Sequence, residues 1–333
     1  MINFEKNLNK ELNLLRGELL SLTYHPQAHK CFIICDPKTR TIHSSTFRDR
    51  LVHHALVNIL EPIFEKRFIY DSYAGRKKKG ALKAVQRFNK FKRKVSQNGR
   101  LVKKAHTNND NKDYALKADI KHYFEAVDHQ VLIEIIQRKI KDEKVICLIK
   151  KILKNYKTKR VGRGMPLGNL TSQFFANVYL NELDYFIKHK LKIKYYIRYV
   201  DDFVILEKER KELETYKEQI ATFLREDLKI ELHPEKSSIF PLRKGITFLG
   251  YRIFYHYTLL RKRNKRSFDK KFVWRLELYK KGFYKKEELF EQVYGWFGYA
   301  RWANTYALRN KILETINSTK IISGPVGTFD KSP

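Results

Sequence analysis

Two apolar segments that favour β-strands flank a pair of adjacent aspartates in the second half of the chain. Tyr195–Ile197 precedes the run Tyr199-Val200-Asp201-Asp202, and Phe203–Leu206 follows it. This pattern predicts two strands joined by a tight turn that carries both carboxylates. Carboxylates between apolar strands cost free energy unless a cation lies beside them, whereas a surface turn accounts for Asp without any function. The turn has neither Gly nor Asn, and on this run alone a metal site and a simple turn are about equally supported.

A third aspartate ends another strand-like segment. Asp119 follows Tyr114–Ala118 and precedes the aromatic pair Tyr123-Phe124. By itself, an Asp in this place is more typical of a turn or a helix cap. Together, Asp119 and Asp201 could hold two Mg²⁺ ions about 3.5–4 Å apart, as two-metal phosphoryl transfer requires. Few carboxylates are needed, because water and substrate phosphates complete the coordination of Mg²⁺.

The net charge favours a polyanionic partner. Lys and Arg number 69 against 36 Asp and Glu, which gives +33. Such an excess repels itself in a compact chain unless a polyanion neutralises it, and nucleic acid gains affinity by releasing counterions. Solubility alone rarely requires so large a single-sign excess. A basic membrane-surface protein would need an amphipathic basic helix or a lipidation signal, and the sequence shows neither.

The cysteines indicate neither a zinc site nor a disulfide framework. Cys31 and Cys35 bracket an apolar run and are interpreted as small core residues, and Cys147 is the third. No further Cys or His pair completes a zinc site, and an odd, low count fits a reducing compartment. The chain has no apolar leader and no apolar run of membrane-spanning length. A cytoplasmic protein without a membrane partner is therefore predicted.

The chain mixes hairpin connections with βαβ-like ones, which predicts an α+β architecture. Thr46 is expected to cap the second helix. Residues 96–112 are expected to form a loop, and the end of the chain, from residue 323, is expected to be loose. The predicted helices cover residues 1–24, 46–60, a basic helix that follows Gly80 up to residue 94, 128–141, 143–154, 170–189, 208–227, 267–283, 286–303 and 306–316. The predicted strands cover residues 31–34, 40–43, 114–119, 195–206, 230–232, 238–240 and 248–254.

In this order, the motifs resemble those of bacterial reverse transcriptases over roughly residues 20–310. Tyr199-Val200-Asp201-Asp202 is similar to the palm hairpin of that family, and Asp119–Phe124 is similar to its first catalytic block. The resemblance implies a right-hand polymerase, whose palm is an antiparallel sheet with helices. The implied parts are an N-terminal helix and fingers (1–112), a palm (113–256, with interleaved fingers and palm elements at 143–170), a helical thumb (257–320) and a flexible tail (321–333).

The resemblance also implies roles for single residues. Asp119, Asp201 and Asp202 would be catalytic, and with Ile120 they would hold two Mg²⁺ ions, for which Mn²⁺ could substitute. Phe124 would exclude a 2′-hydroxyl and so favour deoxynucleotides. The implied nucleotide contacts are Arg40, Arg76, Phe124, Leu167, Gly168, Gln173 and Lys236, and the implied primer or template contacts are Tyr199, Val200 and Gly250. For Arg40 and Arg76 a structural role is a strong alternative, because a chain this basic has many arginines in loops.

Gly164–Gln173 suggests a subfamily. Retroviral and group II intron enzymes usually carry Gln after the Pro of this loop, where this chain has Leu167 followed by Ser172-Gln173. This form resembles the reverse transcriptases of diversity-generating retroelements, which copy a template RNA with frequent errors opposite adenine. An aliphatic side chain against the nucleotide offers packing without hydrogen bonds, so discrimination should weaken there. The alternative is a packing choice with ordinary fidelity.

The implied reaction is RNA-directed synthesis of cDNA from dNTPs on a template RNA and a DNA primer. The resemblance further implies a bacterial or phage origin and a small basic accessory protein. The residues from Thr305 to the end are expected to be too few for a nuclease or integrase domain. The alternatives are a retron, phage-defence or degenerate group II intron reverse transcriptase. An inactive RNA-binding protein on a polymerase scaffold is the alternative from another functional class.

Overall fold

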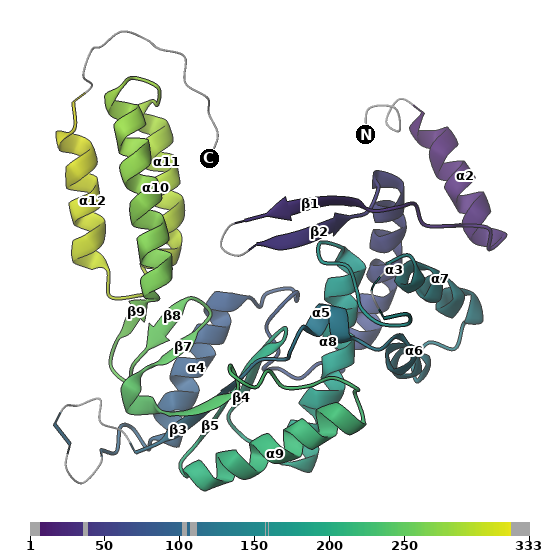
Figure 1. Ribbon diagram of the computed structural model, residues 1–333, viewed down its shortest axis with the longest axis horizontal. Coiled ribbons are helices and arrows are strands. Elements are labelled where there is room, and N and C mark those ends of the chain that lie inside the picture. Colours follow the sequence, from purple (N-terminus) through teal and green to yellow (C-terminus); the bar gives the residue numbers. More distant parts are fainter. Residues whose placement is uncertain are drawn as a thin grey trace. The chain divides into compact units, whose positions relative to one another are not determined.

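The computed structural model describes residues 7–35, 39–101, 105–106, 112–156, 158 and 160–320, with the helices and strands labelled in Figure 1. The chain forms two compact units. The first unit combines residues 1–91 with 114–240, and the second combines residues 92–113 with 241–333. Within the described part of the chain, no helix has the length and apolar character that crossing a membrane requires.

The first unit contains most of the helices and strands. Its N-terminal half holds α2 (Leu8–Leu20), β1 (Lys30–Ile34), β2 (Arg40–Ser44), α3 (Phe47–Glu65) and most of α4 (Ala81–Val95). The remaining elements are β3 (Tyr114–Ala118), α5 (Tyr123–Ala126), α6 (His129–Gln137), α7 (Glu143–Lys154), α8 (Leu170–Tyr185), the π-helix η1 (Phe186–Lys190), β4 (Tyr196–Tyr199), β5 (Asp202–Glu207), α9 (Arg210–Glu226) and β6 (Ser238–Pro241).

A sheet with the strand order β4-β5-β3-β6 forms the centre of this unit. β5 pairs antiparallel with β4 on one side and with β3 on the other, as Figure 1 shows. The register places Tyr199 opposite Asp202, which confirms the predicted tight turn between two strands. On the other side, Ala118 lies opposite Phe203. Asp119, the next residue after β3, is therefore brought level with the acidic pair.

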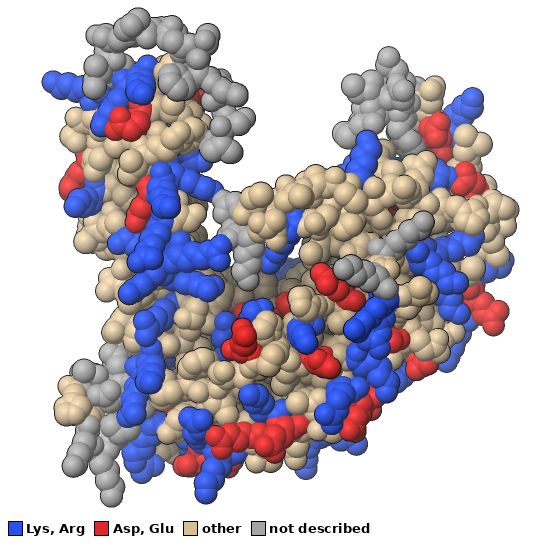
Figure 2. All heavy atoms as spheres, viewed as in Figure 1, with Lys and Arg blue, Asp and Glu red and all other residues tan. Residues whose placement is uncertain are grey.

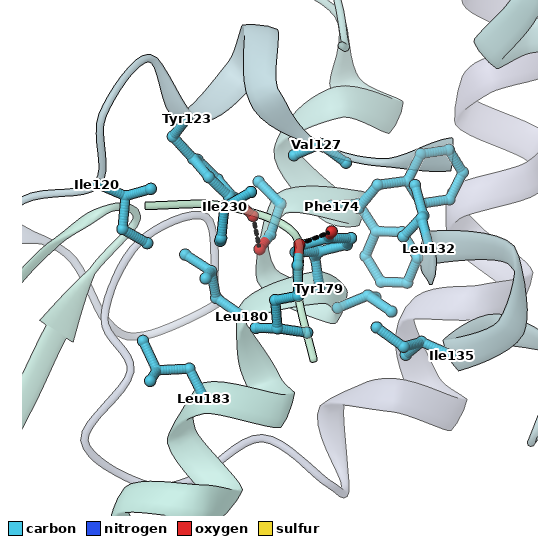
Figure 3. Packing of buried hydrophobic residues seen from close by; sticks show 14 of the residues in the cluster. Ile120, Tyr123, Val127, Leu132, Ile135, Phe174, Tyr179, Leu180, Leu183 and Ile230 are labelled. Carbon is cyan, nitrogen blue, oxygen red and sulfur yellow. Dashed lines mark hydrogen bonds between the residues drawn. The ribbon is translucent and has the colours of Figure 1, made fainter. Parts of the chain in front are cut away.

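The core of the first unit forms where α8 packs between the sheet and the neighbouring helices. α8 has no single apolar face, and its residues are buried along most of its length, as expected for a helix enclosed by other elements. Figure 3 shows Ile120, Tyr123, Phe174 and Tyr179 meeting in this core. The buried Tyr123 hydroxyl donates a hydrogen bond to the Ala176 carbonyl at 2.7 Å, which satisfies the polar end of an otherwise apolar ring.

Some predicted boundaries differ from the observed ones. Residues 230–232 were predicted as a strand, but Leu232 forms a single isolated bridge with Ile120, and Pro234, which lacks a donor for a ladder, follows two residues later. The predicted strand 248–254 is divided at Leu249-Gly250. Both of these residues have positive φ, 46° and 90°, which reverses the chain. The predicted cap is confirmed, because the Asp49 amide donates to the Thr46 hydroxyl at 3.3 Å.

The interpretation of Cys31 and Cys35 as core residues is wrong. Both thiols are exposed, as is Cys147. The physical reason is that β1 and β2 form a separate two-stranded sheet, so no second layer of the described residues covers the apolar side chains of β1. The Cys31 Sγ lies 3.1 Å from His43 Nδ1 on the opposite strand. The expected loose end of the chain lies outside the described residues.

The second unit consists of a small sheet and a helical bundle. The sheet contains β7 (Ile246–Phe248), β8 (Tyr251–Ile253) and β9 (Thr258–Leu260), which follow the short 3₁₀ helix η2 (Leu242–Lys244). The bundle contains α10 (Lys262–Lys280), α11 (Lys286–Ala300) and α12 (Tyr306–Ser318), so the three predicted C-terminal helices are confirmed. Its core is Phe268, Leu276, Tyr279, Leu289, Val293, Phe297, Ile312 and Ile316.

Candidate active site

Three aspartates meet at the end of the central sheet. Asp201 lies in the turn between β4 and β5, Asp202 begins β5, and Asp119 follows β3. Val200, also in this turn, has φ of +55°, a left-handed conformation that β-branched residues rarely adopt. Such backbone strain costs on the order of 1–3 kcal/mol and persists where surrounding contacts fix the conformation, often at functional sites.

The segment after α9 holds Asp119 from the other side. The His233 amide donates to the Asp119 carbonyl at 2.7 Å, and the Ser237 hydroxyl lies 3.3 Å from both the amide and the carbonyl of Asp119. Between them, Lys236 reaches the Asp119 carboxylate, with Nζ 2.8 Å from Oδ2. The Lys236 side chain is half exposed, so this ion pair faces solvent on one side. Lys236 is thus the predicted nucleotide contact that lies directly beside the acids.

Ionising both Asp201 and Asp202 is electrostatically unfavourable while no metal ion is bound beside them. Burial and then the adjacent Asp119 carboxylate raise the pKa of Asp201 to about 6. Burial also raises the pKa of Asp202 to about 7, against the opposing effect of Lys117, whose Nζ lies 3.8 Å from Asp202 Oδ2. The other oxygen of Asp202, Oδ1, is buried without a hydrogen-bond partner in the described part of the chain. A divalent cation would relieve both the repulsion and this unsatisfied oxygen.

The donor set suits Mg²⁺. No three His, Cys, Asp or Glu side chains of the described residues are already gathered as a metal cage. Mg²⁺ does not need such a cage, because it binds one or two carboxylates and completes its octahedron with water and phosphate oxygens. The Ile120 side chain packs in the core (Figure 3), and both hydrogen bonds of its bridge come from neighbouring residues, Lys121 and His233. Its carbonyl thus stays outside that bridge, beside Asp119.

The glycine-rich loop before α8, Gly162–Gly168, lies against β2. The His43 amide donates to the Leu167 carbonyl at 3.0 Å. Gly168 has φ of +108°, and a Cβ there would lie 2.8 Å from Ile42 Cγ2, so the close approach requires glycine. The structure therefore brings Leu167 and Gly168 to the strand that begins with Arg40, whose side chain is exposed.

The other residues predicted to contact nucleotide, primer or template differ in their exposure and in the elements that hold them. Phe124 is half-buried, and its carbonyl accepts a hydrogen bond from the Met165 amide at 2.6 Å, which ties it to the same loop. Gln173 is exposed on α8. Tyr199 is half-exposed at the end of β4. Gly250 belongs to the second unit, where its carbonyl accepts a hydrogen bond from the Tyr299 hydroxyl at 2.7 Å.

Arg76 is not brought to the acids. Its Nε and Nη2 donate to the Glu65 carboxylate at 2.7–3.0 Å, and Nη1 donates to the carbonyls of Ile69 and Ser72. The guanidinium also lies over the Phe68 ring, 5.4 Å from its centroid. The side chain retains 6% exposure, so its donors are used within the fold. These contacts favour the structural role that the sequence left open for Arg76.

A cavity of about 670 Å³ begins at the residues that follow Ile120. Its volume is within the range of pockets that bind ligands of nucleotide size. The predicted nucleotide contacts do not line it, although Glu125, the residue after Phe124, does. Four of the lining residues are basic and come from three distant parts of the chain, so sequence reading missed them. The lining consists of His43, Lys121, His122, Glu125, Ala126, Tyr156, Thr158, Arg160, Arg163, Lys229, Ile230 and Glu231.

Basic residues also gather on the second unit. Figure 2 shows blue side chains of Lys and Arg along the face of α10. The sequence of this helix gives the reason, because it begins with Lys262-Arg263-Asn264-Lys265-Arg266 and all four of these cations are exposed. An exposed row of cations on one helix is suited to contacts with a phosphate backbone.

Comparison with known proteins agrees with the site. A family model described as "Reverse transcriptase (RNA-dependent DNA polymerase)" matches residues 35–253. Protein YkfC of Escherichia coli K12 is 26% identical over 300 residues, which cover 78% of this chain and 74% of YkfC. The group II intron-encoded protein LtrA of Lactococcus lactis is 29% identical over 304 residues. That match covers 69% of this chain but 47% of LtrA, so this chain spans about half of that relative.

Solved structures show the same fold. Apo telomerase from Candida tropicalis, truncated from its C-terminal domain, superposes with a TM-score of 0.51 at 12% identity, covering 75% of this chain and 60% of that one. This supports the predicted polymerase fold of fingers and palm. The family model includes all three aspartates, the β4–β5 turn and the glycine-rich loop. The chain therefore belongs to the reverse transcriptase family, the RNA-dependent DNA polymerases.

Proposed function

We propose that this chain extends a primer on a template RNA by a two-metal mechanism centred on Asp119 and Asp201. The observation that carries the proposal is the register of β3, β4 and β5, which puts these carboxylates side by side although they are distant in sequence. Two Mg²⁺ ions, when bound, supply an activated 3′-hydroxyl and neutralise the leaving pyrophosphate. Asp202, with its raised pKa and unsatisfied Oδ1, supports them as a ligand or as a neighbour of the ligands.

The other residues of the site bind and orient the nucleotide. Lys236 lies beside Asp119, where its charge offsets that of a triphosphate. The four cations that line the cavity, Lys121, Arg160, Arg163 and Lys229, outnumber its two carboxylates, Glu125 and Glu231, in a space of nucleotide size. Phe124, fixed to the glycine-rich loop through its carbonyl, is proposed as the residue that excludes a 2′-hydroxyl.

Primer extension on an RNA template tests this assignment. Asp201→Asn keeps the size of the side chain and removes its charge. The primer-extension rate of this variant should fall by more than about 100-fold, because even the loss of a residue that only contacts a metal ligand lowers metal affinity or activity about 10–100-fold. The matched control is Asp227→Asn, because Asp227 is exposed at the end of α9 and belongs to no part of the site. Equal rates for the two variants would show that Asp201 is not a metal ligand.

We further propose that the enzyme is error-prone at template adenines and serves a diversity-generating retroelement, together with a small basic accessory protein. Leu167 supports this, because its backbone is fixed against β2 while its aliphatic side chain lacks hydrogen-bonding groups. The alternatives are a group II intron-like enzyme, favoured by the similarity to LtrA, and a retron or phage-defence enzyme. Whether the polymerase is active at all is decided by the Asp201 experiment, which also tests the inactive RNA-binding alternative.

Fidelity measurements separate these alternatives. Misincorporation should be higher opposite adenine than opposite the other bases on matched RNA templates. Leu167→Gln, which adds hydrogen-bonding groups, should reduce the errors at adenine, whereas Leu167→Met, which stays apolar, should keep them. Ordinary fidelity at adenine in the unmodified chain would rule out the mutagenic role and leave the polymerase assignment intact.

A further inference from the structure

A fully buried arginine lies directly behind the acidic turn. Arg198 on β4 has no exposed surface and forms a two-pronged ion pair with the equally buried Asp184 of α8, at 2.7 Å from Nε and 2.6 Å from Nη2. Its third nitrogen, Nη1, donates to Asn177 Oδ1 at 3.2 Å and to the Val200 carbonyl at 3.1 Å. The Tyr196 hydroxyl donates to the same Asp184 carboxylate at 2.7 Å. The side chain is therefore held at every nitrogen.

This arrangement is a poor way to gain stability alone. A buried ion pair is often no more stable than apolar residues of the same volume, because both charges lose their hydration. The guanidinium instead provides hydrogen-bond donors in fixed directions, because it is planar. Asp184 accepts two of the nitrogens and leaves Nη1 aimed at the turn. The contact with Val200 thus follows from the way the ion pair is built.

The contacted carbonyl belongs to the peptide that joins Val200 to Asp201. Fixing that carbonyl fixes the plane of the peptide, and with it the direction in which the Asp201 side chain leaves the backbone. Val200 also has the strained φ of +55°, so the turn needs contacts that hold it. The charge of Arg198 is balanced by Asp184, so its effect on Asp201 is positional rather than electrostatic.

The same arginine ties the turn to the segment before Arg76. The Arg198 amide donates to the Asp71 carbonyl and its carbonyl accepts from the Tyr73 amide, each at 3.0 Å. Asn177, which accepts from Arg198, donates through Nδ2 to the Ala74 carbonyl at 2.8 Å. A helix, a strand and a loop are thereby fixed to one buried group. All of these contacts lie within the first unit.

We infer that Arg198 is a positioning residue that orients the Val200–Asp201 peptide, and with it the Asp201 carboxylate, for metal binding. The inference rests on the proposed role of Asp201. Loss of Arg198 should therefore alter the metal dependence and the rate of the chemical step before it alters nucleotide binding. A residue that only stabilised the fold would lower the melting temperature and leave those quantities unchanged in the folded protein.

Arg198→Lys tests this, because it keeps a charge beside Asp184 and loses the fork. The kcat for primer extension should fall about 10- to 100-fold, the effect of a small misplacement of a reacting group. The KM for dNTP should stay within about twofold, and the Mg²⁺ concentration for half-maximal rate should rise several-fold. The matched control is Tyr196→Phe, which removes one hydrogen bond to Asp184 without touching the turn. It should lower the melting temperature by about 4 °C and leave kcat and the Mg²⁺ requirement unchanged.

A second readout needs no turnover. Mg²⁺ should raise the melting temperature of the full chain and of Tyr196→Phe, and should raise that of Arg198→Lys less. An equal shift in Arg198→Lys, or unchanged kcat and Mg²⁺ dependence, would overturn the inference. If Arg198→Lys fails to fold, Asn177→Ala replaces it, with a smaller loss of kcat expected and an unchanged kcat counting against the inference. A full chain that binds Mg²⁺ but does not extend primers would refute the proposed function alone.

Discussion

Neutralising Asp202 should make the metal-free protein more stable while impairing catalysis. Burial raises the pKa of this carboxyl from 3.8 to about 7, although Lys117 opposes the rise. Each tenfold change in proton affinity is worth about 1.4 kcal/mol, so ionising Asp202 in the fold costs up to about 4 kcal/mol. The side chain keeps 26% exposure, and Asn retains a buried oxygen while losing the attraction to Lys117. A gain of about 2 kcal/mol is therefore expected for Asp202→Asn at pH 8.

The sign of the pH dependence follows from the raised pKa. Between pH 4 and 7 the folded state holds a proton on Asp202 that the unfolded state has lost, so stability falls as pH rises through this range. Asp202→Asn does not titrate at this position. Its advantage over the unmodified chain should thus be near zero at pH 4, grow up to pH 7 and stay constant above it.

Urea unfolding in the presence of a chelator, followed at pH values from 4.5 to 8.5, measures this difference. Asp201 titrates in both proteins, and the loss of the Asp202 charge removes a repulsion between the two carboxylates, which adds to the advantage of the variant at high pH. Primer extension by the variant, with Mg²⁺ restored, should be strongly reduced. An Asp202→Asn protein that is no more stable at pH 8 than at pH 5, relative to the unmodified chain, would refute the electrostatic account of the turn.

Three further predictions concern the surroundings of the acids. Lys236→Met removes the cation beside Asp119, so the pKa of the neighbouring Asp201 should rise and the acid limb of the pH–rate profile should move to higher pH. Urea unfolding of that variant should change by less than about 1 kcal/mol, because the ion pair is half exposed. Gly168→Ala should lower stability by about 1–3 kcal/mol in thermal unfolding, since it adds a Cβ 2.8 Å from Ile42 at a positive φ, and an equally stable variant would contradict the close approach of the loop to β2. Phe124→Ala should increase incorporation of ribonucleotides relative to deoxynucleotides in single-turnover assays, and an unchanged ratio would remove Phe124 from the role of sugar gate.

The strands and the acids were predictable because their signals are local. Apolar, β-prone flanks around Tyr199–Asp202 fix the pairing of β4 with β5, and the strand before Asp119 has the same character. Thr46 and the helix after it carry their own cap signal. Cys31 and Cys35 were misplaced for the opposite reason. An apolar strand predicts burial only if a second layer covers it, and the sequence does not show that β1 is exposed along its length.

The rest of the site depends on contacts between distant segments. The cavity cations Lys121, Arg160 and Lys229 are ordinary surface residues by sequence, and only the fold gathers them. Arg198 is adjacent to the predicted turn, yet a lone Arg in an apolar strand gives no indication of its partner Asp184. One signal was available, since a charged residue inside a buried strand requires a counter-charge. Only the structure, in which α8 packs against β4, identifies that counter-charge as Asp184.

The strand order β4-β5-β3-β6 also has a consequence for how this protein is made. β3 cannot find its partner until β5 has been synthesised, and α5 to α8 lie between them in the chain. Pairings between such distant segments form slowly, because much of the chain must be ordered first. During synthesis, Asp119 and the acidic pair therefore cannot come together until residue 207 has emerged from the ribosome. A nascent or prematurely terminated chain carries Asp119 as an isolated carboxylate, so catalytic competence is acquired late in folding.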